Sequence, residues 1–120
     1  MSELEWNGEN ITKLLKRSID EVVHDCAMDL KRVSVNRAPI DTGALRRSAY
    51  VYKTKDLERE VGYDRNNARG ILRTYAIVQH ERTDFSHPNG GEAKFLEAPF
   101  NERKERYKDA ISRRLREATR

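Results

Sequence analysis

The sequence has a single cysteine and no long apolar run, and each shortage excludes a class of protein. Cys26 alone cannot form a disulfide within the chain or build a cysteine-rich zinc site. No apolar stretch approaches the ~18 residues of a membrane span. The first six residues, Met-Ser-Glu-Leu-Glu-Trp, are acidic where a secretory signal is basic and then apolar. We therefore expect a protein that is made and used without export and has no membrane partner.

Apolar residues are also in limited supply. The chain has 120 residues, of which 37% are hydrophobic and 37% charged, which suits one domain with a single modest core. This balance favours an elongated or assembling protein over a compact enzyme with a deep pocket. No nucleophile–base arrangement, phosphate loop or dinucleotide fingerprint occurs, so we expect no enzymatic activity and no cofactor. The mixed charges of residues 56–60 are typical of solvated ion pairs.

The net positive charge is confined to the last twenty residues. Residues 101–120 hold eight lysines and arginines against four acids, and this difference of four equals the whole net charge of +4. A basic C-terminal helix can meet nucleic acid or an acidic protein surface. Tyr107 is the only aromatic residue among residues 101–120, which gives little scope for base stacking. A helix-turn-helix is not indicated, because this segment follows a long loop. A DNA-binding regulator stays an alternative.

Apolar residues at steps of three and four predict a long amphipathic helix over about residues 10–36. Asn10 is a suitable N-cap, and Pro39 would end the helix because the residue before a proline disfavours the helical conformation. Such a helix, roughly 40 Å long, must cross a sheet, pack on another long helix or protrude. We expect Cys26 to be buried on the apolar stripe of this helix. The stripe consists of Ile11, Leu14, Leu15, Ser18, Val22, Cys26, Leu30 and Val33, and it is widened by Ile19, Val23 and Ala27.

The remaining elements predict an α+β fold, with the long N-terminal helix and a C-terminal helix packed on a small antiparallel sheet. Residues 49–80 form the sheet region, in which strand formers at 49–54 and 59–63 predict a β-hairpin. Residues 64–70 are polar and end in glycine, which indicates a loop. Residues 71–80 fit either a strand or a short helix.

A long polar loop is expected over residues 81–92, and a helix over 97–118. Pro99 is compatible with the first turn of that helix. Its apolar face is Phe100, Tyr107, Ile111, Leu115 and Ala118.

The segment Pro39-Ile-Asp-Thr-Gly43 contains Asp-Thr-Gly, the tripeptide of aspartic proteases. Those enzymes need two such aspartates that share a proton, each on a loop in an apolar setting. Here the tripeptide follows a helix rather than an apolar strand. Arg46 and Arg47 would hold Asp41 ionised. Catalysis by Asp41 is therefore not expected.

The same segment, residues 39–48, reads instead as a hinge between the long helix and the sheet. Pro39 stops the helix, Asp41 or Thr42 accepts hydrogen bonds from the following backbone, and Gly43 permits the tight path. Leu45 would anchor the turn in the core. Arg46 and Arg47 would face outward.

Histidines near an acid raise the possibility of a metal site. His80, Glu81 and His87 are close in sequence, and His24 lies on the long helix. The spacing of seven between His80 and His87, with a proline between them, matches no standard zinc motif. We expect no metal, and place His24 at the edge of the helix stripe.

Three short motifs follow one another along the chain. The first is Pro39-x-Asp-Thr-Gly-x-Leu-Arg-x-Ser48. The second is Tyr75-Ala76-x-x-Gln-His-Glu-Arg-Thr83. The third is Lys94-Phe-Leu-Glu-Ala-Pro-Phe100. In this order, after a long N-terminal helix, they resemble a family of small phage proteins known as minor capsid, tail-component or tail-completion proteins of long-tailed bacteriophages. Many members have glycine in place of Arg82. With the first and last helices, the resemblance covers roughly residues 10–118.

The resemblance implies a structural virion protein of the phage neck, made in the host cytoplasm and without catalysis. Its partners would be copies of itself in a ring, with sixfold symmetry expected, the tail tube or tail-terminator protein, and the head connector or stopper protein. Contact with DNA in the lumen would be transient. Another minor capsid or tail role is the alternative. The expected assembly contacts are Arg46, Arg47, Arg82, Asp84, Phe85, His87, Asn89, Arg113, Arg114 and Arg116, and the expected core residues are Leu45, Tyr75, Phe95, Leu96 and Phe100.

Overall fold

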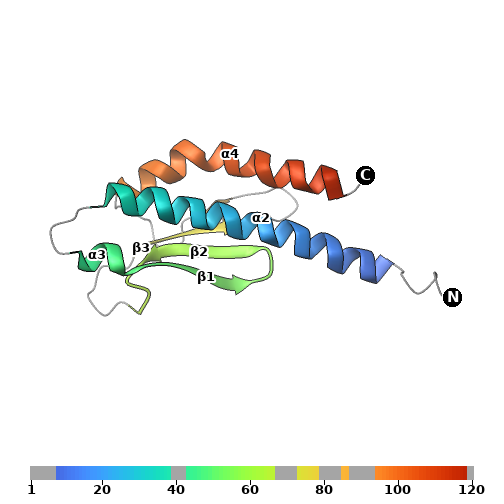
Figure 1. Ribbon diagram of the computed structural model, residues 1–120, viewed down its shortest axis with the longest axis horizontal. Helices are drawn as coiled ribbons and strands as arrows, with labels where there is room; N and C mark the ends of the chain where they lie inside the picture. Colours follow the sequence, from blue (N-terminus) through green and yellow to red (C-terminus); the bar gives the residue numbers. More distant parts are fainter. Residues whose placement is uncertain (1–7, 39–42, 67–72, 79–84, 87–93, 119–120) are drawn as a thin grey trace.

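The computed structural model describes residues 8–38, 43–66, 73–78, 85–86 and 94–118. Two long helices and an antiparallel sheet make up the fold, which confirms the α+β class (Figure 1). The chain extends 62 × 26 × 20 Å, so it is elongated. The elements in order are α2 (Gly8–Arg37), α3 (Ala44–Arg47), β1 (Ala49–Lys55), β2 (Glu58–Tyr63), β3 (Arg73–Val78), β4 (Phe85–Ser86) and α4 (Lys94–Ala118).

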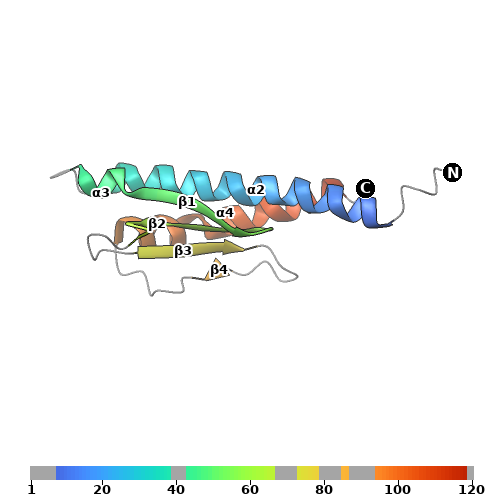
Figure 2. The same ribbon diagram turned by 90° about the horizontal axis from the view of Figure 1, so that it is seen from below.

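The two long helices lie side by side in one layer, and the sheet forms the other layer (Figures 1 and 2). Helix α2 packs against β1, β2 and β3, while α4 packs against α2 and β3. Because α2 and α4 are antiparallel, the start of one lies beside the end of the other. The sheet packs against one face of this helix layer and covers it.

Helix α2 confirms the helix expected over residues 10–36 and extends it by two residues at its N-terminal end and one at its C-terminal end. Most of the apolar stripe is buried, including Cys26 at 5% exposure. Leu14 is an exception, because its side chain is 63% exposed. The stripe therefore predicts the buried face only where the sheet and α4 cover the helix. The buried members are Ile19, Val22, Val23, Cys26, Ala27, Leu30 and Val33.

The sheet is antiparallel with strand order β1-β2-β3-β4. Strands β1 and β2 form the expected hairpin, paired from Ala49↔Tyr63 to Lys55↔Glu58 with a register shift near its turn. Within the ambiguous segment 71–80, the described residues 73–78 form strand β3. The loop expected over 81–92 is wrong at residues 85–86, which pair with β3 as β4. A two-residue strand depends on an available sheet edge, because it is too short to show a period of its own.

An ion pair between buried Arg59 and partly buried Asp20 fastens the hairpin to α2. Arg59, only 6% exposed, donates from Nη1 to Asp20 Oδ1 at 2.9 Å and from Nη2 to Asp20 Oδ2 at 2.8 Å. The N–H of Leu57, a residue with φ of 66°, also donates to Asp20 Oδ1 at 2.8 Å. The reading of residues 56–60 as solvated ion pairs is therefore wrong for Arg59. Its partner lies 39 positions away in sequence, so the local pattern could not reveal it.

Helix α4 begins at Lys94, three residues before the expected start. Pro99 is consequently in the second turn rather than the first, and its ring is fully buried. Leu96 and Phe100 are buried as expected, and Phe95 and Leu45 pack against the core as partly buried residues. Tyr75 lies in β3. Leu115 departs from the expected apolar face, since it is 40% exposed.

The core between the layers includes a polar contact that orients an aromatic ring. Ser34 Oγ and the Tyr63 hydroxyl oxygen lie 2.7 Å apart and share a hydrogen bond. The Tyr63 ring also meets Phe95 edge to face, with ring centroids 5.2 Å apart and an interplanar angle of 84°. Burying Tyr63 leaves its hydroxyl satisfied, as buried polar groups require. This contact joins the end of α2, β2 and the start of α4.

Candidate functional site

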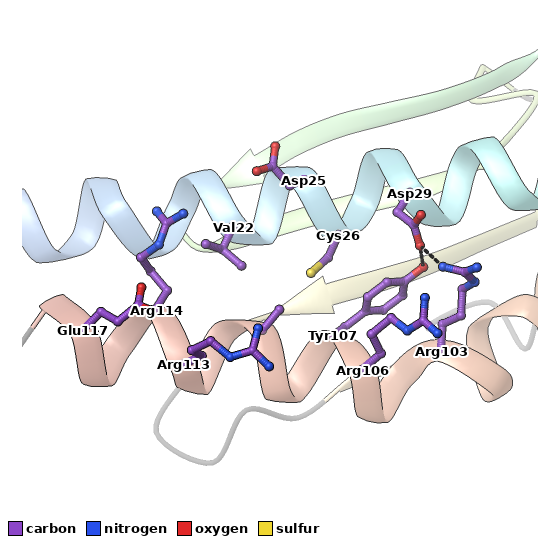
Figure 3. A pocket seen from close by; sticks show the side chains of 11 residues that line it. Val22, Asp25, Cys26, Asp29, Arg103, Arg106, Tyr107, Arg113, Arg114 and Glu117 are labelled. Carbon is purple, nitrogen blue, oxygen red and sulfur yellow. Dashed lines mark hydrogen bonds and ion pairs between the residues drawn. The ribbon is translucent and has the colours of Figure 1, made fainter.

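A groove of 460 Å³ runs between α2 and α4 on the face opposite the sheet (Figure 3). Its apolar part is formed by Val22, Cys26 and Ala110. The charged residues that line it on α2 are Asp25 and Asp29. Those on α4 are Arg103, Arg106, Arg113, Arg114 and Glu117. The groove is therefore a shallow channel with an acidic wall on one helix and a mainly basic wall on the other.

Asp29 joins the two walls near the middle of the helices. Its Oδ2 accepts hydrogen bonds from Arg103 Nη1 and the Tyr107 hydroxyl, both at 2.7 Å, and its Oδ1 accepts one from Arg32 at 2.7 Å. Burial alone would raise the pKa of Asp29, but these hydrogen bonds bring it below the ordinary value. Burial and the bond to Asp29 raise the pKa of Tyr107. Asp29 is thus an ionised structural acceptor.

Arg114 joins the walls at the other end of the groove. Its Nη1 donates to the Ser18 carbonyl oxygen at 3.1 Å and to Ser18 Oγ at 3.2 Å, and lies 3.6 Å from Glu21 Oε1. Arg114 was expected to be an assembly contact with Arg113 and Arg116. The structure instead uses it to hold α4 against α2, while Arg113 and Arg116 are exposed.

The groove does not offer a reactive nucleophile in its described residues. Burial raises the pKa of the Cys26 thiol to about 12, and the nearby Asp29 and Asp25 carboxylates add to this rise. A thiol is nucleophilic only when ionised, so Cys26 is inert at neutral pH. Among the described residues, no three His, Cys, Asp or Glu side chains form a group that could hold a metal ion. His80, Glu81 and His87 lie outside the described residues, and His24 is exposed.

The hinge expected over residues 39–48 is described from Gly43 onward. Gly43 has a φ of 70° and precedes α3. Glycine adopts this left-handed backbone conformation without steric strain, which explains its presence here. Arg47 is exposed, as expected. Arg46 is not: its guanidinium donates to the Ala38 carbonyl oxygen at 3.1 and 2.8 Å and to that of Asn36 at 3.4 Å. It satisfies carbonyl groups at the end of α2, a need the linear sequence does not display.

Replacing Gly43 with valine is expected to destabilise the protein by about 1–2 kcal/mol, because a β-branched residue is strained at positive φ. A Cβ at this position would also lie 2.9 Å from Arg47 Nη1, at the flexible end of a side chain. Asparagine tolerates this conformation better, so Gly43→Asn should lose less. Urea unfolding of both variants tests the order, and equal stability of the valine variant and the wild type would contradict it.

The remaining hinge residues and expected contact residues are only partly placed. Phe85 lies in β4. Pro39, Asp41, Thr42, Arg82, Asp84, His87 and Asn89 lie outside the described residues. The charged groove residues that sequence reasoning missed are Asp25, Asp29, Arg103, Arg106 and Glu117. Their signal was weak, because each has the spacing of an ordinary solvated charge on a helix.

Comparisons with protein-family models, with curated proteins and with solved structures found no match for this chain. Within the described residues, no helix is both long and apolar enough to cross a membrane.

Proposed function

We propose that this protein is a structural subunit of the neck of a long-tailed bacteriophage, in a tail-completion or head–tail joining role. It would assemble as a ring between the tail tube and the head connector. The observation that carries the proposal is the ordered set of three motifs. The first links α2 to β1, the second begins within β3, and the third opens α4. A role as another minor capsid or tail component rests on the same motifs.

The geometry around two of these motifs supports a shared structural purpose. Arg46, from the first motif, donates to the Ala38 carbonyl oxygen at the end of α2. Phe95, from the third, packs edge to face on Tyr63. Arg37 at the end of α2 also pairs with Glu102 of α4 at 2.8 Å. Residues of two motifs thus lie at the junction of the helices and the sheet, which supports the proposal of an architectural role.

The elongated form and the two-walled groove suit a subunit that packs laterally. Large parts of both long helices face solvent, and repeated subunits need such faces for their contacts. Some charged groups of the groove bind across the helix pair, as Asp29 and Arg103 do, an arrangement suited to holding two helices together. A structural role is consistent with both features.

Quantitative mass spectrometry of purified particles from the source of this sequence tests the proposal. Particles would be analysed intact and after heads and tails are separated. We expect the chain at a low copy number set by the ring symmetry, with the tail fraction or the junction. Absence from particles would contradict a virion role.

That absence would favour the alternative of a DNA-binding regulator that uses the basic helix. Exposed Arg106, Arg113 and Arg116 would then contact phosphates. A gel shift with duplex DNA across a salt series separates the two functions, because phosphate contacts weaken steeply with salt. No binding at low salt would remove the regulator.

A further inference from the structure

Three exposed charges beside the groove have no partner within the part of the chain that the structure describes. Asp25 on α2 makes no hydrogen bond or ion pair there, and neither do Arg106 and Arg113 on α4. The other charges that cross between the helices are satisfied, as in Asp29 with Arg103 and Glu21 with Arg114. The three residues therefore present opposite charges on one face, and no described side chain neutralises them.

The cross-helix contacts fix the relative heights of these charges. Asp29 meets Arg103 and Tyr107, and Glu21 meets Arg114. Asp25 lies one helical turn from both Asp29 and Glu21, so it is level with about Ala110.

Ala110 in turn lies about one turn from Arg106 and one from Arg113. Asp25 is thus level with the midpoint between the two arginines but on the other helix. Figure 3 shows its carboxylate directed away from α4, and the arginines extended along α4.

This arrangement is complementary to itself under one rotation. A twofold axis parallel to the helices exchanges the acidic wall with the basic wall and leaves the height along the helices unchanged. It therefore places Asp25 of a second copy over Ala110, between Arg106 and Arg113. A twofold axis across the helices would instead bring acid against acid and arginine against arginine.

We propose that the open face of the α2–α4 layer docks a second copy of this chain about that axis. Each copy inserts Asp25 between Arg106 and Arg113 of the other, so that one contact is made twice, as in isologous dimers. The small side chain of Ala110 leaves room for the incoming carboxylate. Met28, 44% exposed and one turn from Asp25, adds apolar area beside the charges.

A second copy suits this face better than a polyanion does. Nucleic acid would gain from Arg106 and Arg113 but would be repelled by Asp25, which lies on the facing helix. A second copy satisfies both signs at once. The contact is independent of the proposed virion role, because its evidence is the distribution of charge on the face.

Analytical ultracentrifugation of the full chain and of two variants tests this surface. The first variant is Asp25→Arg, and the second is Arg106→Glu with Arg113→Glu. Each alone would bring like charges together, so we expect dimerisation to weaken at least about tenfold. An equimolar mixture of the two variants should form a heterodimer. One of its two contacts joins the Asp25→Arg position to the Arg106→Glu and Arg113→Glu positions, and the other joins the native Asp25 to the native Arg106 and Arg113. Glu105→Arg changes the net charge by the same amount as Asp25→Arg but lies on an exposed α4 residue outside the groove, so it should dimerise like the wild type.

The result expected for the wild type is a dimer at low salt that weakens near about 1 M salt, where the Debye length is about 3 Å. A wild-type chain that stays monomeric at high concentration and low salt would overturn the proposal. So would a wild-type dimer unaffected by either variant, or a mixture that stays monomeric. Monomeric wild type that binds duplex DNA through Arg106 and Arg113 would assign the face to a polyanion instead. Particle mass spectrometry measures none of these quantities, so each proposal can fail alone.

Discussion

Replacing Asp20 with asparagine is expected to lower the free energy of unfolding by about 3 kcal/mol. The change keeps the shape of the side chain but removes the negative charge that Arg59 binds through two hydrogen bonds. Arg59 is 6% exposed, so its charge would stay buried without a counter-ion. Urea unfolding at neutral pH measures the loss. Asp109→Asn, which alters an exposed aspartate of α4, is the matched control and should change stability by less than about 0.5 kcal/mol.

The same ion pair should make stability depend on pH. The hydrogen bond from Arg59 is the largest cause that lowers the pKa of Asp20 from 3.8 to about 2, against the opposing effect of burial. A carboxyl group whose pKa is lower in the folded than in the unfolded protein stabilises the fold at pH values above its unfolded pKa. This stabilisation is lost as the pH falls through the folded pKa. For Asp20 the lost contribution to the free energy of unfolding is about 2 kcal/mol. The stability gap between the wild type and Asp20→Asn should therefore narrow between about pH 5 and pH 2, and a constant gap would contradict the assignment.

Replacing Leu30 with alanine is expected to cost about 3–4 kcal/mol. Leu30 is fully buried on α2 in the main apolar cluster. Its removal loses apolar contact and leaves a cavity between α2 and the surrounding core. Thermal or urea unfolding measures the effect, and a loss below about 1 kcal/mol would show that the neighbouring side chains collapse into the space.

Leu14 provides a control of identical chemistry on the same helix. It belongs to the same apolar stripe, yet its side chain is 63% exposed. Leu14→Ala should therefore change the free energy of unfolding by less than about 0.5 kcal/mol. Similar losses for Leu14→Ala and Leu30→Ala would mean that a further surface covers Leu14 in solution.

The contrast between these leucines shows how far helical periodicity reaches. The period located α2 and the general face that it buries, because burying apolar area is the main source of helix stability in proteins. It could not locate where the covering layer stops. Leu115 on α4 shows the same limit, since it continues the apolar face but is 40% exposed.

Elements defined by backbone pairing were harder to predict than the helices. The β1–β2 hairpin was predictable because its strand formers are near one another in sequence. Residues 85–86 were not, because their strand exists only through pairing with β3. The early start of α4 places Pro99 in the second turn, where propensity alone disfavours proline.

Polar contacts between distant residues escaped prediction altogether. Asp20–Arg59 and Asp29–Arg103 join residues 39 and 74 positions apart. In the sequence their members look like ordinary surface charges. Arg46 likewise gave no local sign that it binds the Ala38 carbonyl oxygen. The groove could be inferred only when both helices were in place, because half of it belongs to each.

The two walls of the groove between α2 and α4 are far apart in sequence, and this separation also affects the order of folding. The β1–β2 hairpin joins neighbouring segments, whereas Arg114 meets Ser18 across 96 positions. Closing long loops costs more entropy and slows contact formation. We expect the hairpin and the α2 face above it to gain protection first, and the groove last. Pulsed hydrogen exchange during refolding should therefore protect the amides of β2 before those of α4, so the chain would be unable to recognise a second copy until its final helix has docked.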